Sequence, residues 1–216
     1  MAHRNTGGHN PVAESAPGQT APEPADSHRG YQPAICVFCG SSLGNDLLYA
    51  KTARDLGRQI GEGGYRLVFG GGAVGLMGEV ARTARSAGAP IIGILPAFLR
   101  GVEPPLKSAE ELVITPDLQQ RKSRMLALAD AFVILPGGLG TLDEFFEVVT
   151  STQLKVHSKP VVVVDVAGYF APLRALLDQV VAHGFARPEI ANHQEFVATP
   201  AEALARITLR LSARGR

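Results

Sequence analysis

Seven short apolar runs constrain the fold of this chain more than any other feature, because helical patterns separate them from residue 33 onward. They occupy residues 34–38, 66–70, 90–95, 112–115, 131–135, 160–166 and 195–198. Strands that alternate with helices form a sheet with helices on both faces. Near-continuous apolar strands are typical of parallel sheets, which are buried on both sides. The sequence therefore predicts an α/β fold with a doubly wound, mostly parallel sheet.

Apolar residues at helical spacing predict the core-facing sides of two helices. One set follows the first predicted strand and the other follows the sixth; they are Tyr49, Ala53, Leu56 and Ile60, and Leu173, Leu176, Leu177 and Val180. A capping-box pattern opens the segment 199–211, with Thr199 as the N-cap, Pro200 in the first turn and Glu202 three residues after the cap. This segment predicts a last helix that closes the domain.

Residues 1–32 differ in composition from the rest of the chain. They are rich in Pro, Gly, Ser and Ala and contain almost no large aliphatic residue. Such a segment cannot bury enough apolar surface to offset the entropy lost on ordering. We predict a disordered tail over residues 1–32 and one nucleotide-binding domain over residues 33–216, a length that suits a single α/β core.

Charge and hydropathy exclude two classes of partner. The formal net charge is +1 and the charged residues are mixed along the chain, so we expect no nucleic acid polymer as a partner. A small anion needs no net positive charge, because backbone donors can hold it. No apolar run approaches the roughly 18 residues of a membrane span, and the first ten residues lack the apolar region of a secretory signal. We expect a soluble, cytoplasmic protein with no membrane partner.

Cys36 and Cys39 have the C-x-x-C spacing of some redox and metal sites, but they lie in an apolar strand-like run rather than at a strand-to-helix corner. Residues three apart on a strand point to opposite faces, which disfavours a disulfide. Two cysteines alone also do not make a zinc site. We interpret them as buried structural thiols and expect no metal.

Two predicted strands end in glycine-rich loops that lead directly into helices. One loop lies within "LVFGGGAVGLMGEVA", before a helix near Leu76, and the other within "VILPGGLGTLDEFFEVV", before a helix near Thr141. Open α/β sheets bind ligands beyond the carboxyl ends of their strands, and helix N-termini favour anions such as phosphate. Either loop alone could be a tight turn, but two of the same design favour phosphate binding. The expected binding residues are Gly70, Gly71, Gly72, Gly75, Gly137, Gly138, Gly140 and Thr141.

Two common phosphate motifs are absent from these loops. Neither contains the Gly-Lys pair of a Walker motif. A dinucleotide-binding fold would need an acidic residue about twenty positions after the first glycine, where this chain reads "GAPIIGILP". The sequence therefore disfavours a nicotinamide dehydrogenase.

Charged residues lie close to the second glycine loop. Glu144 is three residues after Thr141, one turn into the predicted helix, and Glu147 follows on nearly the same helix face. The segment before the preceding strand supplies Arg121, Lys122 and Arg124. Such charges are usually solvated, but Glu144 next to an anion site would lie close to any sugar that the phosphate carries. We interpret Glu144 as a functional residue.

These segments resemble the LOG family of cytokinin-activating nucleoside 5′-monophosphate phosphoribohydrolases, many of which have been labelled lysine decarboxylase-like. "PGGLGTLDE" matches the P-G-G-x-G-T-x-x-E pattern of that family, and "CVFCGSS", "GGGAVGLMGEVA", "RKSRM" and "QLKVHSKPV" are similar to family segments in the same order. The resemblance extends from Ile35 to about Phe185. The resemblance also adds three residues to the expected substrate-binding set: Ser41, which lies within "CVFCGSS", Lys122 and Glu147.

The resemblance implies a Rossmann-like domain, commonly a homodimer, that cleaves the N-glycosidic bond of an adenine-type nucleotide without a cofactor. The catalytic Arg and Glu of the family fall on Arg121 and Glu144. The chain departs from the family pattern at Gln119, where His is usual, and at Ser151, in a region that usually has Trp; both departures are expected near the site. Nothing in the sequence suggests a pyridoxal phosphate site.

Two alternatives remain open on the sequence alone. The same fold could bind or sense a nucleotide without cleaving it. The substrate could also be AMP or another ordinary nucleotide rather than a cytokinin nucleotide.

Overall fold

The computed structural model of the protein describes residues 32–101, 104–106 and 109–214. The predicted tail, residues 1–32, therefore lies outside the described residues except for Gln32. Residues from Gln32 to Arg216 cluster as one unit. No helix of the described residues has the length and apolar character needed to cross a membrane.

All seven predicted strands are present, and every pair of neighbours in the sheet is parallel. They are β1 (Ala34–Phe38), β2 (Arg66–Phe69), β3 (Ile91–Pro96), β4 (Glu111–Thr115), β5 (Ala131–Ile134), β6 (Val161–Val164) and β7 (Glu195–Val197). Their order in the sheet is β4-β3-β2-β1-β5-β6-β7. The chain thus winds outward in one direction from β1 and then, from β5, in the other. This confirms the doubly wound fold.

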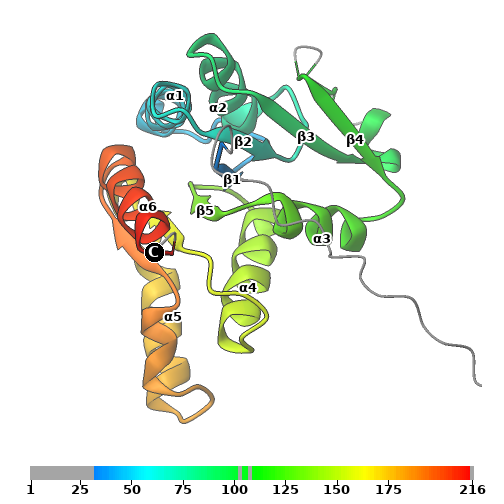
Figure 1. The fold of residues 1–216 in the computed structure, drawn as a ribbon. Helices are drawn as coiled ribbons and strands as arrows, with labels where there is room; N and C mark the ends of the chain where they lie inside the picture. The colour runs from blue at the N-terminus through cyan, green and yellow to red at the C-terminus, as the bar shows by residue number, and fades with distance from the viewer. Residues whose placement is uncertain (1–31, 102–103, 107–108, 215–216) are drawn as a thin grey trace, which may run out of the picture. The chain divides into compact units, whose positions relative to one another are not determined.

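Six helices of the described chain connect the strands: α1 (Leu47–Glu62), α2 (Gly75–Ser86), α3 (Leu118–Leu128), α4 (Leu139–Gln153), α5 (Ala171–Ala182) and α6 (Pro200–Arg214). Side chains of α1, α2 and α6 pack in one hydrophobic cluster and those of α3, α4 and α5 in another. Every strand except β4 contributes to both clusters through its alternating side chains, and β4 contributes Val113 to the second. The sheet therefore has helices on both faces (Figure 1).

The helix predictions hold with one exception. In α1, the side chains of Ala53, Leu56 and Ile60 are fully buried. In α5, Leu173 and Leu177 are almost fully buried, but Leu176 is 51% exposed. Leu173 and Leu177, one turn apart, define the buried side of α5, and Leu176 lies on its flank. The prediction that Leu176 faces the core is wrong.

The start of α6 is capped as predicted, with a small difference. The Oγ1 atom of Thr199 accepts a hydrogen bond from the N–H of Glu202 at 3.2 Å. The Glu202 carboxylate accepts from the N–H of Ala198 at 3.0 Å, one residue before the N–H that a capping box uses. The cap still satisfies a donor of the first turn.

Candidate active site

The change of direction between β1 and β5 creates a crevice at the carboxyl ends of these two strands, where doubly wound folds bind ligands. A cavity of about 190 Å³ lies there. The loop after β1, the first turn of α4 and the side chains of α3 surround it. Its lining residues are Val37, Phe38, Cys39, Gly40, Ser41, Gly70, Met77, Arg121, Met125, Gly138, Leu139, Gly140, Thr141 and Glu144.

Arg121 and Glu144 meet in this cavity from two different helices. The Nη2 atom of Arg121 on α3 lies 3.7 Å from the Oε1 atom of Glu144 on α4, and both side chains are largely buried. The Nε atom of Arg121 is buried and has no hydrogen-bond partner among the described residues. A guanidinium with an unsatisfied donor next to a carboxylate can bind an oxygen-rich ligand while the carboxylate remains available for chemistry.

Gly70 allows Arg121 to reach the cavity. A side chain at Gly70 would collide with the guanidinium of Arg121 and with the sulfur of Met77. The prediction placed Gly70 at the site for its backbone; the structure adds that its missing side chain leaves room for the cation.

The second glycine loop presents free helix donors to the cavity. Gly138 is the N-cap of α4 and supplies no side chain to satisfy the first-turn N–H groups. Side chains added at Gly138 or Gly140 would meet nothing within 4 Å. Thr141, in the same turn, is buried and lines the cavity. Unsatisfied N–H groups at a helix N-terminus favour a bound anion.

The first glycine loop is built differently, although the sequence suggested the same design. The N–H groups of Leu76 and Met77 at the start of α2 donate to the carbonyl oxygens of Ser42 and Gly40 at 3.3 and 3.2 Å. Those donors are therefore occupied by the loop after β1. Gly75 packs closely against Ser41, Gly71 against β3, and Gly72 forms an isolated bridge with Pro105. The first glycine loop therefore packs against the loop after β1 and against β3. Of its glycines, only Gly70 lines the cavity.

Gly137 is also a packing residue. A Cβ atom there would lie 2.7 Å from the backbone nitrogen of Gly40 and would collide with the side chain of Thr141. The hydroxyl of Tyr169, which follows β6, donates to the carbonyl oxygen of Gly137 at 2.5 Å. The N–H of Gly40 donates to the carbonyl oxygen of Pro136 at 3.0 Å. The segments that follow two strands, β1 and β6, thus fix this glycine loop.

Lys122 points away from the cavity into an ion-pair network between α3 and α4. Its Nζ atom lies 3.0 Å from Asp143 and 3.2 Å from Glu147. Burial alone would lower the pKa of Lys122, but the hydrogen bonds from these two carboxylates outweigh it and raise the pKa. Lys122 and Glu147 therefore join the two helices and do not line the cavity, and their contact with substrate stays a prediction.

Cys36 and Cys39 are free thiols, as predicted, and lie on opposite faces of the sheet. Burial, followed by the nearby charge of Glu144, raises the pKa of Cys39 well above its ordinary value. Cys39 lines the cavity, which the sequence interpretation missed. As a protonated thiol it acts as a small apolar wall.

The cavity gathers seven of the predicted site residues and leaves six outside its lining. Those inside are Ser41, Gly70, Arg121, Gly138, Gly140, Thr141 and Glu144; those outside are Gly71, Gly72, Gly75, Lys122, Gly137 and Glu147. Gln119 and Ser151, expected near the site, do not line it either. Within the described ranges, no three His, Cys, Asp or Glu side chains gather as metal ligands do.

Known proteins resemble the chain over most of its length. A family model described as "Possible lysine decarboxylase" matches residues 77–207. A probable cytokinin riboside 5′-monophosphate phosphoribohydrolase of Oryza sativa subsp. japonica is 42% identical over 161 residues, covering 74% of this chain and 72% of the rice protein. A cytokinin riboside 5′-monophosphate phosphoribohydrolase of Arabidopsis thaliana is 42% identical over 154 residues, covering 71% and 72%.

Solved structures with lower sequence identity share the fold. The molybdenum cofactor carrier protein of Chlamydomonas reinhardtii superposes with a TM-score of 0.65 at 24% identity, over 85% of this chain and 99% of that one. The molybdenum cofactor binding protein of Rippkaea orientalis has a TM-score of 0.64 at 22% identity, over 84% and 99%. The family model and the 42% identical relatives go further than the fold: the chain belongs to the LOG family, whose curated members are named cytokinin riboside 5′-monophosphate phosphoribohydrolases.

Proposed function

We propose that this protein hydrolyses the N-glycosidic bond of cytokinin riboside 5′-monophosphates, or of AMP and related adenine nucleotides, to give free base and ribose 5-phosphate. The observation that carries the proposal is the buried Arg121–Glu144 pair next to the uncapped N-terminus of α4. The names of the 42% identical relatives support the same reaction.

The 5′-phosphate is expected to bind the first turn of α4. The N–H groups there lack a side-chain cap, and the helix dipole favours negative charge at this end. Thr141 can add a hydroxyl donor from the same turn. Binding energy from the phosphate, remote from the bond that breaks, can then orient the sugar over Glu144.

Glu144 is the proposed general base. The oxygen of a water molecule bonds to C1′ while the C1′–N9 bond breaks, and the base leaves with the electron pair. The base takes up a proton from solvent, and Glu144 afterwards releases to solvent the proton that it accepted. The Glu144 carboxylate accepts a proton from the water and stabilises the positive charge that develops on the sugar. Arg121 stays protonated and cannot serve as an acid, so we assign it to binding the ribose or phosphate and to orienting Glu144.

The cavity is too small to hold a whole nucleotide. Its volume of about 190 Å³ is below the roughly 300 Å³ at which ligand pockets usually begin. We infer that phosphate and ribose occupy the cavity and that the base extends toward its mouth, where Leu139 is 85% exposed. Selection between adenine and a substituted adenine would then take place outside the catalytic residues.

A lysine decarboxylase activity has no support in this site. A Schiff-base lysine must be neutral to react, and enzymes achieve this by lowering its pKa. Lys122, the lysine closest in sequence to Arg121, has a raised pKa and two carboxylate partners. No lysine is among the residues that line the cavity.

Replacement of Glu144 by Gln tests the proposal. Loss of general-base assistance typically costs about 10² to 10⁴ in rate, so E144Q should release almost no free base from either nucleotide in a chromatographic assay. Asp143→Asn is a matched control, because it removes a carboxylate one residue away that is exposed and pairs with Lys122. A thermal melt of each variant separates loss of catalysis from loss of folding, since E144Q leaves Arg121 without its partner.

The rival proposal is a nucleotide-binding protein without catalysis. It predicts that the wild-type protein binds the nucleotide but releases no base from either substrate. Turnover by the wild type and by D143N, with binding but no turnover by E144Q, would exclude it. Turnover that survives in E144Q would refute the role of Glu144.

A further inference from the structure

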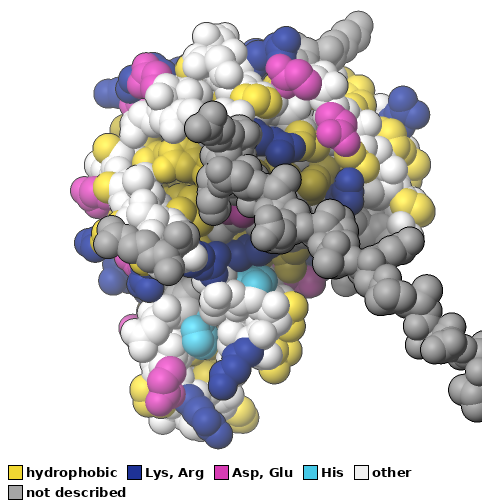
Figure 2. All heavy atoms as spheres, in the orientation of Figure 1, with side chains coloured by type: hydrophobic (Ala, Val, Ile, Leu, Met, Phe, Trp, Pro, Cys, Tyr) yellow, Lys and Arg dark blue, Asp and Glu magenta, His cyan; other side chains and the backbone are white. Residues whose placement is uncertain are grey.

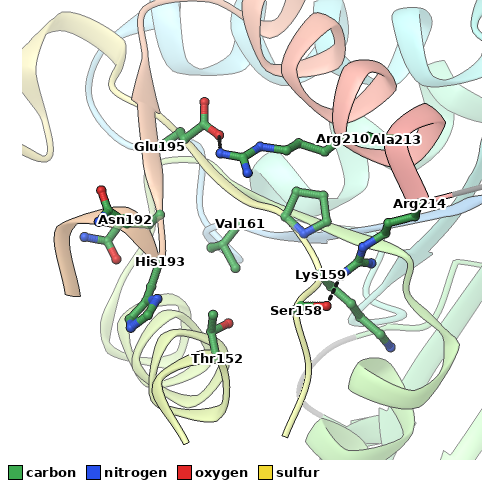
Figure 3. Close-up of a pocket in the computed structure, with 12 residues that line it drawn as sticks. Thr152, Ser158, Lys159, Val161, Asn192, His193, Glu195, Arg210, Ala213 and Arg214 are labelled. Atoms are coloured by element: carbon green, nitrogen blue, oxygen red, sulfur yellow. Dashed lines mark hydrogen bonds and ion pairs between the residues drawn. The ribbon is translucent and has the colours of Figure 1, made fainter. Parts of the chain in front are cut away.

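A second cavity, of about 370 Å³, lies where β6 and β7 begin. The glycine loops lie at the carboxyl ends of the strands, so the two cavities are at opposite ends of the sheet. Figure 3 shows that the side chains around it come from the end of α4, the start of β6, the segment before β7 and the last turns of α6. They include Thr152, Ser158, His193, Glu195, Arg210 and Arg214.

Three arginines form a stripe along α6 beside this cavity. Arg206, Arg210 and Arg214 are spaced four residues apart and so share one helix face. Glu195 pairs with the first two, at 3.6 Å from Arg206 and 2.8 Å from Arg210. Arg214 forms no ion pair with a carboxylate of the described residues; it donates to the Oγ atom of Ser158 at 2.6 Å. The cavity therefore keeps a cation without a counter-charge.

Two neighbouring groups respond to this positive charge. Burial holds the pKa of Lys159 below its ordinary value. The charge of Arg214 adds to this shift, and the charge of Asp130 opposes it. Burial, Lys159 and Arg214 likewise lower the pKa of His157. The Nζ atom of Lys159 donates to the carbonyl oxygen of Leu126, and its side chain runs away from the space between Arg214 and His193 (Figure 3). Lys159 thus adds to the positive potential without occupying the cavity.

Gln194, in the cavity wall, has an unsatisfied polar atom. The residue is only 6% exposed, and its carbonyl oxygen is buried with no hydrogen-bond partner among the described residues. A buried acceptor without a donor costs free energy. Gln194 lines both this cavity and a smaller one beside α5, and a bound water in either would supply the missing donor. In Figure 2, dark-blue Lys and Arg side chains gather near the middle of the view with His side chains below them.

We propose that this cavity binds the phosphate group of a small soluble molecule, at a site separate from the Arg121–Glu144 cavity. Arg214 supplies a guanidinium that pairs with no carboxylate of the described residues, Arg210 supplies a second one from the same face of α6, and the hydroxyl of Ser158 can donate. Arginine binds phosphate through paired N–H donors and is well suited to this role. Because Glu195 retains Arg206, Arg210 can turn to an anion without leaving that carboxylate unpaired.

Binding of inorganic pyrophosphate to the full chain tests the proposal by isothermal titration calorimetry at constant ionic strength. The double variant R210Q/R214Q should bind it at least about tenfold more weakly, because it removes both guanidiniums that would donate to the phosphate. Arg58→Gln is the control, because it removes an exposed arginine that pairs with a glutamate on α1 and does not line this cavity. It should bind within about twofold of the wild type, since only exposed charge is lost.

Two results would overturn the proposal. One is equal affinity of the wild type and R210Q/R214Q, or no detectable binding by the wild type. The other is weakened binding only in Gly138→Ala, which would assign the anion to the α4 loop. Because the assay uses no nucleotide substrate, its outcome is independent of whether the protein hydrolyses nucleotides.

Discussion

Tyr169 positions the second glycine loop although it does not line the cavity. Its hydroxyl donates to the carbonyl oxygen of Gly137, and its ring packs edge-on against Tyr49 and Phe170. In a planar trans peptide the C=O and the following N–H point in opposite directions. Holding the Gly137 carbonyl outward therefore turns the N–H of Gly138 toward the cavity. We infer that Tyr169 is a positioning residue.

Tyr169→Phe should weaken nucleotide binding without removing catalysis. A neutral hydrogen bond contributes about 0.5–1.5 kcal/mol, so KM should rise about three- to tenfold while kcat changes little. Tyr49→Phe is the control, because it removes a hydroxyl from the same aromatic group without touching Gly137. Steady-state kinetics on both variants measures KM and kcat separately. A fall in kcat with unchanged KM in Y169F would contradict the role in binding.

Sequence identified the proposed catalytic pair more readily than the residues that support it. Arg121 and Glu144 were identified from motifs and they meet at 3.7 Å. Tyr169 lies 32 residues from Gly137, and nothing local to either residue indicates that contact. Cys39, Met77 and Met125 were missed for a related reason: apolar residues in strands and helices are usually core residues, and only the fold shows which of them line a cavity.

The two glycine loops differ at the scale of the secondary-structure element. In α2 the first-turn donors bind the carbonyls of Ser42 and Gly40, whereas α4 begins at an uncapped glycine. The sequences of the loops are alike because both strands turn directly into helices. The loop after β1 satisfies first-turn N–H groups of α2 and not those of α4. The order of the strands in the sheet determines which helix this loop contacts.

Glycine substitutions in the second loop separate packing from binding. Gly137→Ala should lower the melting temperature, because its Cβ would collide with Thr141 and overpacking typically costs about 1–3 kcal/mol. Gly138→Ala meets no atom within 4 Å and has a negative φ of −88°, so it should fold normally. Its methyl group would lie at the anion site and raise KM for the nucleotide. Thermal melts and kinetics test both, and a stable G137A protein would contradict the packing role of Gly137.

At the scale of the whole molecule, strand order explains where the site lies. The seven strands and their parallel direction were predictable from apolar runs, and the crevice between β1 and β5 follows once the order is known. The order itself, and the exposure of Leu176, depend on long-range packing that hydrophobic periodicity does not contain.

We also propose that the protein is a homodimer, as the family resemblance implies. Leu118 on α3 and Phe146 on α4 are 47% and 39% exposed, and both helices cover the same face of the sheet. Exposed apolar side chains favour association. Sedimentation should give twice the 22.8 kDa mass of one chain, and Phe146→Glu should shift the protein toward monomer. A wild-type protein that remains monomeric at micromolar concentration would refute the proposal.

The central claim is that the N-terminus of α4 holds a 5′-phosphate so that the sugar lies over Glu144. The most direct test compares the release of free base from a nucleoside 5′-monophosphate and from the matching nucleoside by the wild-type protein, followed by chromatography. We predict a value of kcat/KM at least about a hundredfold higher for the monophosphate, since phosphate contacts to backbone donors contribute several kcal/mol. Comparable rates on the two substrates would contradict the claim.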